Sequence, residues 1–212
     1  MKKTILLISF LATCTFSNAF AAELAPNVKF KDSYTIVSDK NMYRDFAPLN
    51  ADGSVNAIVE IPTGDNEKWE VGKDGIMTWE LRNGKPRIVE YLGYPGNYGM
   101  IPRTIGGDGD SLDILILGPA VPRGTWMNVK IIGALKMLDK NEVDDKLIAV
   151  VPNSYFGACN DLSELDQKFP NATTIIETWF SNYKGAGKMK SLGYVEANEA
   201  KQILADAVNE YK

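Results

Sequence analysis

The chain has 212 residues, of which 45% are hydrophobic and 24% charged, and these values fit one globular domain with its own core. They exclude a disordered chain and a protein with many membrane spans. The formal net charge is −4, which argues against nucleic-acid binding because phosphate contacts need Lys and Arg. The absence of His excludes Ser-His-Asp and Cys-His catalysis, as well as His-ligated zinc. A metal site would therefore use oxygen ligands, which suit Mg²⁺, Mn²⁺ or Ca²⁺.

The first 21 residues have the pattern of a secretory signal peptide. Two lysines at 2–3 are followed by an apolar run over 5–12 and by a small-x-small cleavage site, Ala-Phe-Ala, at 19–21. The run is shorter than the roughly 20 residues that span a bilayer. We therefore predict export to the periplasm or medium after cleavage near Ala21, with a lipoprotein attached through Cys14 as the alternative. Loss of the two lysines leaves 21 basic against 27 acidic residues, a net charge of −6.

Strand patterns come first along the chain and helical patterns come late. Residues 22–54 are polar and mixed, and we expect them to be an irregular N-terminal extension of one domain that spans 22–212. This order predicts a mainly β, α+β fold, with a small barrel or sheet and appended helices. The expected strands are 57–62, 68–71, 76–81, 112–117, 127–137 and 146–151, with turns at 73–75 and 83–84, and the expected helices are 161–169, 172–183 and 197–211.

An acidic, glycine-rich loop directly precedes the apolar strand expected at 112–117. Asp108, Asp110 and Asp113 fall within six residues, and carboxylates so close repel one another unless a cation neutralises them. An EF-hand loop that starts at Asp108 would need an acid or Asn at 112 and Gly at 113, so this pattern fails. The loop therefore indicates a site for a hard cation, and a solvated acidic turn is the alternative.

A second acidic cluster lies before the strand expected at 146–151. Together the two clusters offer enough carboxylate for several metal ions at one barrel mouth, and two-metal sites suit phosphoryl displacement. The 94–99 segment adds a rigid turn with two phenols. Several cations could contact phosphate oxygens, although each of them alone is more typical of an exposed surface charge. The second cluster is Asp139, Glu142, Asp144 and Asp145, and the cations are Lys68, Arg87, Lys146, Lys184 and Lys190.

Several of these segments, in the same order, resemble the soluble (family I) inorganic pyrophosphatases. Residues 108–113 are similar to the family's Asp-Gly-Asp-Pro-x-Asp signature, with Ser111 in place of Pro and all three Asp kept. The resemblance covers residues 57–190, and the 22–54 segment carries none. The other matching segments are Glu60-Ile61-Pro62, Lys68-Trp69-Glu70, the Tyr-Pro-x-Asn-Tyr-Gly motif at 94–99, the acidic loop at 136–147 and Tyr183-Lys184.

The resemblance implies roles for fourteen side chains. Asp110 would accept a proton from the attacking water, with Glu70 as a supporting acid and Tyr94 orienting the acidic groups. The implied metal ligands are Asp108, Asp113, Asp144, Asp139 and Glu60. The implied substrate-binding groups are Lys68, Arg87, Tyr98, Lys146, Tyr183 and Lys184.

The resemblance also implies a fold, a reaction and an assembly. The fold would be a five-stranded OB-type β-barrel flanked by α-helices. The reaction would be hydrolysis of pyrophosphate to two phosphates by metal-activated water, with several Mg²⁺ ions per site or possible use of Mn²⁺. The assembly would be a homo-oligomer, a hexamer formed through 172–183, although this segment lacks the family's His. The alternatives are a polyphosphate or nucleotide phosphohydrolase on the same scaffold, and a non-catalytic exported protein that binds divalent cations or phosphate.

Overall fold

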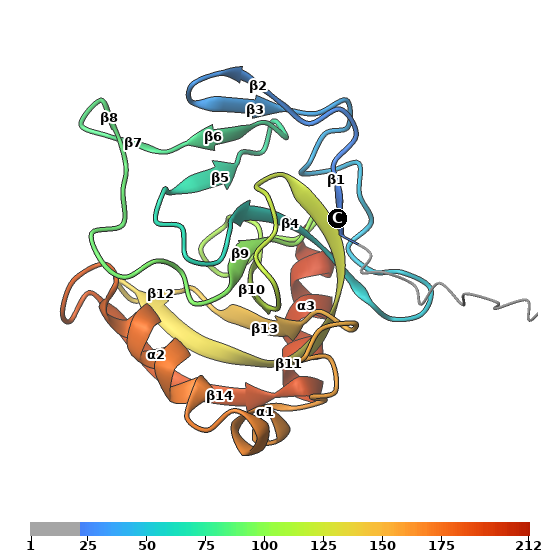
Figure 1. Cartoon of the computed structure of the whole chain (residues 1–212), viewed down its shortest axis with the longest axis vertical. Coiled ribbons are helices and arrows are strands. Elements are labelled where there is room, and N and C mark those ends of the chain that lie inside the picture. The colour runs from blue at the N-terminus through green and yellow to red at the C-terminus, as the bar shows by residue number, and fades with distance from the viewer. Residues whose placement is uncertain (1–21) are drawn as a thin grey trace, which may run out of the picture.

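The computed structural model describes residues 22–212, so the predicted signal peptide and Cys14 lie outside the described residues. Its central feature is a closed ring of five strands (Figure 1). Neighbours in the ring pair antiparallel, except for the parallel pair β10 and β13. This closure confirms the expected barrel. In ring order the strands are β4 (Val55–Ile61), β9 (Asn97–Met100), β10 (Asp113–Leu117), β13 (Lys146–Val150) and β11 (Thr125–Asp139), which returns to β4.

The ring strands pack apolar residues against a separate cluster on each of their two faces. Within β10, Leu115 and Leu117 join a cluster that includes residues of helix α2, whereas Ile114 and Ile116 join a cluster that includes residues of helix α3. Successive side chains of a strand point to opposite faces, so this division follows from the twofold alternation. Strands β4 and β13 are buried at every position. Their near-continuous apolar sequences are typical of strands covered on both sides.

Three helices cover the barrel where the sequence predicts them. They are α1 (Leu162–Lys168), α2 (Ala172–Asn182) and α3 (Ala197–Glu210). The Asp161 carboxylate caps α1 by accepting a hydrogen bond from the Glu164 backbone N–H at 2.7 Å. Apolar residues at helical spacing on α2, including Ile176 and Phe180, are buried in the first cluster.

The long strand β11 links the barrel to the outer elements. Its register shifts twice, between Ile131 and Gly133 against β13 and between Lys136 and Met137 against β14 (Met189–Glu196). Such shifts bend a strand and increase its twist. Strand β11 also pairs with β1 (Ala22–Leu24) and with β12 (Glu142–Val143), which brings the second acidic loop to the end of the barrel.

A separate four-stranded sheet stands beside the barrel, at the top of Figure 1. It contains β2 (Lys29–Asp32), β3 (Thr35–Val37), β6 (Met77–Trp79) and β5 (Trp69–Val71). The hairpin of β7 (Leu81–Arg82) and β8 (Lys85–Pro86) follows, and its turn at 83–84 has positive φ at both residues, as the Asn-Gly pair predicts. The 22–54 segment therefore contributes three strands, where the sequence suggests irregular structure with short elements.

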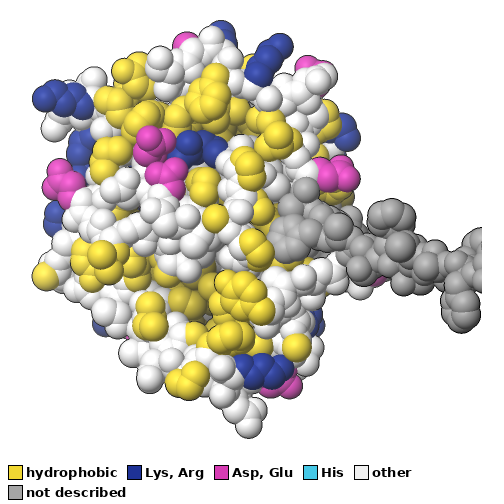
Figure 2. All heavy atoms as spheres, in the orientation of Figure 1, with side chains coloured by type: hydrophobic (Ala, Val, Ile, Leu, Met, Phe, Trp, Pro, Cys, Tyr) yellow, Lys and Arg dark blue, Asp and Glu magenta, His cyan; other side chains and the backbone are white. Residues whose placement is uncertain are grey.

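The surface over the small sheet is partly aromatic. Trp69 and Trp79 stack at 5.4 Å between ring centroids, and the exposed Phe30 and Tyr34 pack against them. Figure 2 shows hydrophobic side chains gathered over this upper part of the face. Within the part of the chain that the structure describes, no helix has the length and apolar character needed to cross a membrane.

Candidate active site

Thirteen of the fourteen predicted site residues line one cavity of about 410 Å³ at the end of the barrel. Its walls come from strands β4, β5, β9, β10, β11 and β13, from the acidic loop before β10, and from the residues that follow α2. The thirteen residues are Glu60, Lys68, Glu70, Arg87, Tyr98, Asp108, Asp110, Asp113, Asp139, Asp144, Lys146, Tyr183 and Lys184.

Tyr94 is the predicted residue that does not line this cavity. It is buried, and its ring packs against Tyr98 at 4.9 Å and against Trp179 at 4.4 Å between ring centroids. The geometry therefore places Tyr94 behind the cavity wall, where it supports the ring of Tyr98. Burial raises the pKa of the Tyr94 phenol, so this group stays protonated.

The glycine that ends the 94–99 motif is explained by the close approach of β9 and β4. A Cβ added at Gly99 would lie 1.9 Å from the carbonyl oxygen of Ile58, which no side chain tolerates. Tyr98, the neighbour of Gly99, takes the opposite face of the strand and points into the apolar cluster beside the site.

The parallel register of β10 and β13 brings the two acidic clusters together. Asp113 opens β10 directly opposite Lys146, which opens β13. The Lys146 side chain is 1% exposed, and its ammonium group forms ion pairs with both Asp113 and Asp144. Two acids from separate loops, Asp113 and Asp144, therefore share one cation in the cavity.

Backbone hydrogen bonds shape the acidic loop itself. The Gly106 N–H donates to the carbonyl oxygen of Asp110 at 2.6 Å, and the Asp110 N–H donates to the Asp108 carboxylate at 3.1 Å. Gly109 has a φ of 83°, which favours glycine. The loop is a tight turn that presents Asp108 and Asp110 at its exposed tip. Neither carboxylate has a Lys or Arg within ion-pair distance among residues 22–212.

The remaining charged groups lie mostly in pairs around the cavity. Lys68 contacts Glu70 at 2.7 Å, Arg87 contacts Glu80 at 2.5 Å and Lys184 contacts Asp139 at 2.7 Å. Glu60 is buried and accepts a hydrogen bond from the Val71 N–H at 2.6 Å. Lys68, Arg87 and Lys184 are therefore each held in an ion pair with a nearby acid.

Burial and neighbouring charges shift the pKa values of the acidic groups. Burial raises the pKa of Glu60 to about 8, although Lys68 opposes the shift, and burial raises the pKa of Asp144 to about 6 against the effect of Lys146. Burial also acts to raise the pKa of Asp113, but Lys146 and Lys68 outweigh it and hold that pKa below its ordinary value. Burial therefore favours the neutral form of Glu60 and Asp144, whereas the neighbouring lysines keep Asp113 ionised.

The cavity suits a hard cation in its donor chemistry. Every candidate ligand is a carboxylate, and two of them, Asp113 and Asp144, already pair with the ammonium of Lys146. Among residues 22–212, no three acidic side chains are gathered tightly enough to enclose an ion. Hard cations take oxygen ligands of this kind and complete their coordination with water or substrate oxygens.

Sequence reasoning missed three polar residues that also line the cavity, namely Tyr43, Lys73 and Thr78. Tyr43 comes from the N-terminal extension, and its pKa is raised by burial, then by Tyr211 and Asp110. Its ring lies 5.6 Å from that of Tyr211, so the extension and the end of α3 meet beside the acidic loop. No local pattern in 22–54 signals this contact, because it depends on how the extension packs.

A closed barrel whose end joins carboxylates, cations and phenols in one cavity fits a phosphohydrolase, because cations can hold an anionic substrate and carboxylates can hold metal ions. Residues 57–212 match the inorganic pyrophosphatase family, so the chain belongs to that family. The soluble inorganic pyrophosphatase 2 of Chlamydomonas reinhardtii is 35% identical over 176 residues, which cover 80% of this chain and 88% of that protein. The inorganic pyrophosphatase of Corynebacterium efficiens is 34% identical over 170 residues, which cover 75% of this chain and 99% of that protein.

Solved structures agree with this assignment. An inorganic pyrophosphatase from Neisseria gonorrhoeae has a TM-score of 0.70 at 30% identity and covers 80% of this chain and 98% of its own. The inorganic pyrophosphatase of T brucei brucei has a TM-score of 0.81 at 20% identity and covers 92% of this chain and 71% of its own. This second likeness concerns the fold alone, and its coverage extends into the N-terminal extension.

Proposed function

We propose that this chain hydrolyses inorganic pyrophosphate to two phosphates. The observation that carries the proposal is the meeting of both acidic loops with Lys68, Arg87 and Lys184 in one cavity. The carboxylates of the cavity repel pyrophosphate unless cations lie between them. The Lys and Arg side chains that now pair with carboxylates can form charge-assisted hydrogen bonds to phosphate oxygens in their place.

Magnesium is the metal that this donor set favours, with Mn²⁺ as an alternative. Asp108, Asp113 and Asp144 would hold the activating ions, while Asp139 and Glu60 would contact ions that arrive with substrate. Bound Mg²⁺ supplies Lewis acidity and lowers the pKa of coordinated water.

The side chains of the protein supply proton transfer, support of the site and phosphate binding. Asp110 stands at the exposed tip of the loop without a cationic partner among the described residues, so its carboxylate is free to take the proton of the attacking water. Glu70 supports the site from β5 through its ion pair with Lys68. The cations stabilise the charge that grows on the leaving phosphate. The groups that hold the two phosphates are Lys68, Arg87, Tyr98, Lys146, Tyr183 and Lys184.

A phosphate-release assay on the chain from Ala22 onward tests this function against its rivals. We expect rapid phosphate release from pyrophosphate with Mg²⁺ and loss of release when a chelator is added in excess. Equal or faster release from tripolyphosphate or ATP under the same conditions would favour the broader phosphohydrolase. Thermal stabilisation by Mg²⁺ without any turnover would instead favour the non-catalytic protein that binds divalent cations or phosphate.

Export and assembly are two further parts of the proposal. The signal-peptide pattern supports an exported chain, and the apolar residues Ile175 on α2 and Leu192 on β14 are 60% and 53% exposed, which supports a homo-oligomer, a hexamer by resemblance. Native mass spectrometry of the protein from its natural host measures the mass of the mature subunit, which gives its first residue, and the number of copies in the assembly. We expect a subunit that begins near Ala22, in an assembly of several copies. A subunit that retains Met1, or a monomer at micromolar concentration, would refute the corresponding part.

A further inference from the structure

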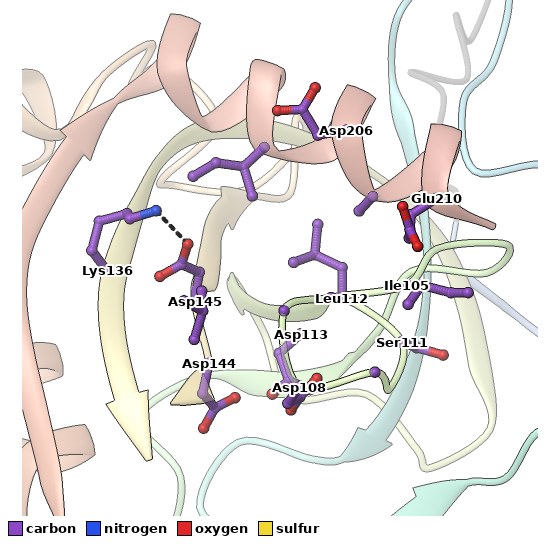
Figure 3. A pocket seen from close by; sticks show the side chains of 16 residues that line it. Ile105, Asp108, Ser111, Leu112, Asp113, Lys136, Asp144, Asp145, Asp206 and Glu210 are labelled. Atoms are coloured by element: carbon purple, nitrogen blue, oxygen red, sulfur yellow. Dashed lines mark hydrogen bonds and ion pairs between the residues drawn. The ribbon is translucent and has the colours of Figure 1, made fainter. Parts of the chain in front are cut away.

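The turn between β5 and β6 places an exposed lysine, Lys73, at the rim of the active-site cavity. Lys73 lines this cavity together with Asp108 and Asp110 of the acidic loop. Figure 3 shows the carboxylates of Asp108, Asp113 and Asp144 on the side of the loop that faces away from α3. Lys73 lines the cavity on that side and not the concavity between the loop and α3. Its side chain therefore lies on the same side of the loop as these carboxylates.

Lys73 is the one cation lining the cavity that forms no ion pair among residues 22–212. An incoming anion can therefore contact its ammonium group without breaking an ion pair of the fold. The other cations each pair with at least one carboxylate, and they are Lys68, Arg87, Lys146 and Lys184.

The charge of Lys73 also acts on the acidic loop. Burial and the neighbouring Asp108 raise the pKa of Asp110, and Lys73 opposes them. Such an influence needs proximity, because the Coulomb energy of two charges falls with their separation. A negatively charged substrate beside Asp110 would therefore meet the positive charge of Lys73 as well.

Hydrogen bonds fix the backbone of the turn that carries Lys73. The Gly72 N–H donates to the Ile76 carbonyl oxygen at 2.9 Å, and the Gly75 N–H donates to the Gly72 carbonyl oxygen at 2.8 Å. Gly75 has a φ of 81°, and a Cβ added there would lie 2.1 Å from the side chain of Asn41. Position 75 therefore needs glycine for its backbone and for the close approach of the N-terminal extension.

The N-terminal extension connects this turn to the segment that leads into the acidic loop. The side-chain amide of Asn41 donates to the Asp74 carbonyl oxygen at 2.6 Å. Two residues later, the carbonyl oxygen of Tyr43 accepts a hydrogen bond from the Arg103 N–H at 2.9 Å. Residues 41–43 therefore hold the turn of Lys73 and the acidic loop in one frame.

We propose that Lys73 is a further substrate-binding residue, which contacts a phosphate group of pyrophosphate at the rim of the cavity. Asn41 is the positioning residue that holds the turn of Lys73 at this rim. The inference rests on the proposed function, because it adds one group that binds the same substrate. A rim lysine contacts the phosphate equally in the ground state and in the transition state, so its loss raises KM and leaves kcat unchanged.

Steady-state kinetics with Mg²⁺ and pyrophosphate tests the role of Lys73. Lys73→Gln should raise KM by about 3- to 10-fold, the loss of one charge-assisted hydrogen bond at an exposed site, and change kcat by less than about twofold. Lys73→Arg keeps the charge and should bring KM back to within about twofold of the parent. Lys29→Gln removes an exposed lysine from β2 of the same small sheet, outside the cavity, and should leave both constants unchanged.

Asn41→Ala tests the positioning role in a double-mutant cycle with Lys73→Gln. Alone, Asn41→Ala should raise KM about 2- to 5-fold, because the turn loses its side-chain bond to the extension. Combined with Lys73→Gln, it should raise KM no further, because both changes act through the same ammonium group. A lower Tm with a parental KM in Asn41→Ala would instead show a role in stability only and refute the positioning.

Binding of methylenediphosphonate, a pyrophosphate analogue with a non-hydrolysable bridge, separates this inference from the proposed function. Calorimetry in the presence of Mg²⁺ should give a Kd about 3- to 10-fold weaker for Lys73→Gln than for the parent chain. This weakening would support Lys73 even in a chain that releases no phosphate, a result that would refute the proposed function alone. Three outcomes would overturn the role of Lys73, namely parental KM and Kd in Lys73→Gln, a fall in its kcat at parental KM, and an equal rise of KM in Lys29→Gln.

Discussion

Asp110→Asn lowers the turnover of pyrophosphate by about 10²- to 10⁴-fold, the range that a general base contributes. The Asp110 carboxylate lies in the active-site cavity without a cationic partner among the described residues, so its charge serves no ion pair of the fold. Its backbone carbonyl closes the loop with Gly106, and Asn keeps that bond. The expected defect is therefore in kcat, with the loop intact.

Two measurements on the same sample check this result. Steady-state kinetics at saturating Mg²⁺ gives kcat, and the shift in Tm on adding Mg²⁺ reports metal binding. We expect the Tm shift to match that of the parent chain. Glu90→Gln, an exposed change outside the cavity, is the control and should keep the parental kcat. A parental kcat in Asp110→Asn would contradict the role of Asp110 as general base. Loss of the Mg²⁺-dependent Tm shift would indicate that Asp110 binds the metal instead.

Lys146→Met destabilises the metal-free chain by about 3 kcal/mol, the lower end of the range for breaking a buried ion pair by removing one partner. The Lys146 ammonium is buried and neutralises both Asp113 and Asp144. Met fills a similar volume, so the loss comes from two carboxylates that face each other without a cation. The lower end applies because Asp113 is about a quarter exposed.

Urea unfolding in the presence of a chelator measures this loss. Lys190→Met, an exposed lysine on β14, is the matched control and should change the free energy of unfolding by less than about 0.5 kcal/mol. Mg²⁺ should narrow the gap between Lys146→Met and the parent chain, because a bound cation replaces the missing charge between the carboxylates. Equal stability of the two variants without metal would show that the buried triad contributes nothing.

Local signals in the sequence predicted elements well where the physical cause is itself local. The Asn83-Gly84 pair adopts the positive φ values of a tight hairpin turn, and the helix expected over 161–169 forms behind the capping carboxylate of Asp161. The sequence pattern did not predict strand β14, because its residues are mostly half-exposed and lack a clear alternation of apolar and polar side chains. Its pairing with β11, rather than its own composition, makes it a strand.

The sequence by itself determined the chemistry of this protein. With no His and two acidic loops it allows only an oxygen-ligated, cation-dependent site, and the order of its motifs identifies the family before any fold is known. The tertiary structure alone decided which of these groups meet. The parallel register of β10 and β13 sets Asp113 beside Lys146, and the packing of the extension brings Tyr43 to the cavity, while Tyr94 lies behind the wall. Such contacts join residues far apart in sequence, so they depend on strand pairing and core packing, which no local pattern encodes.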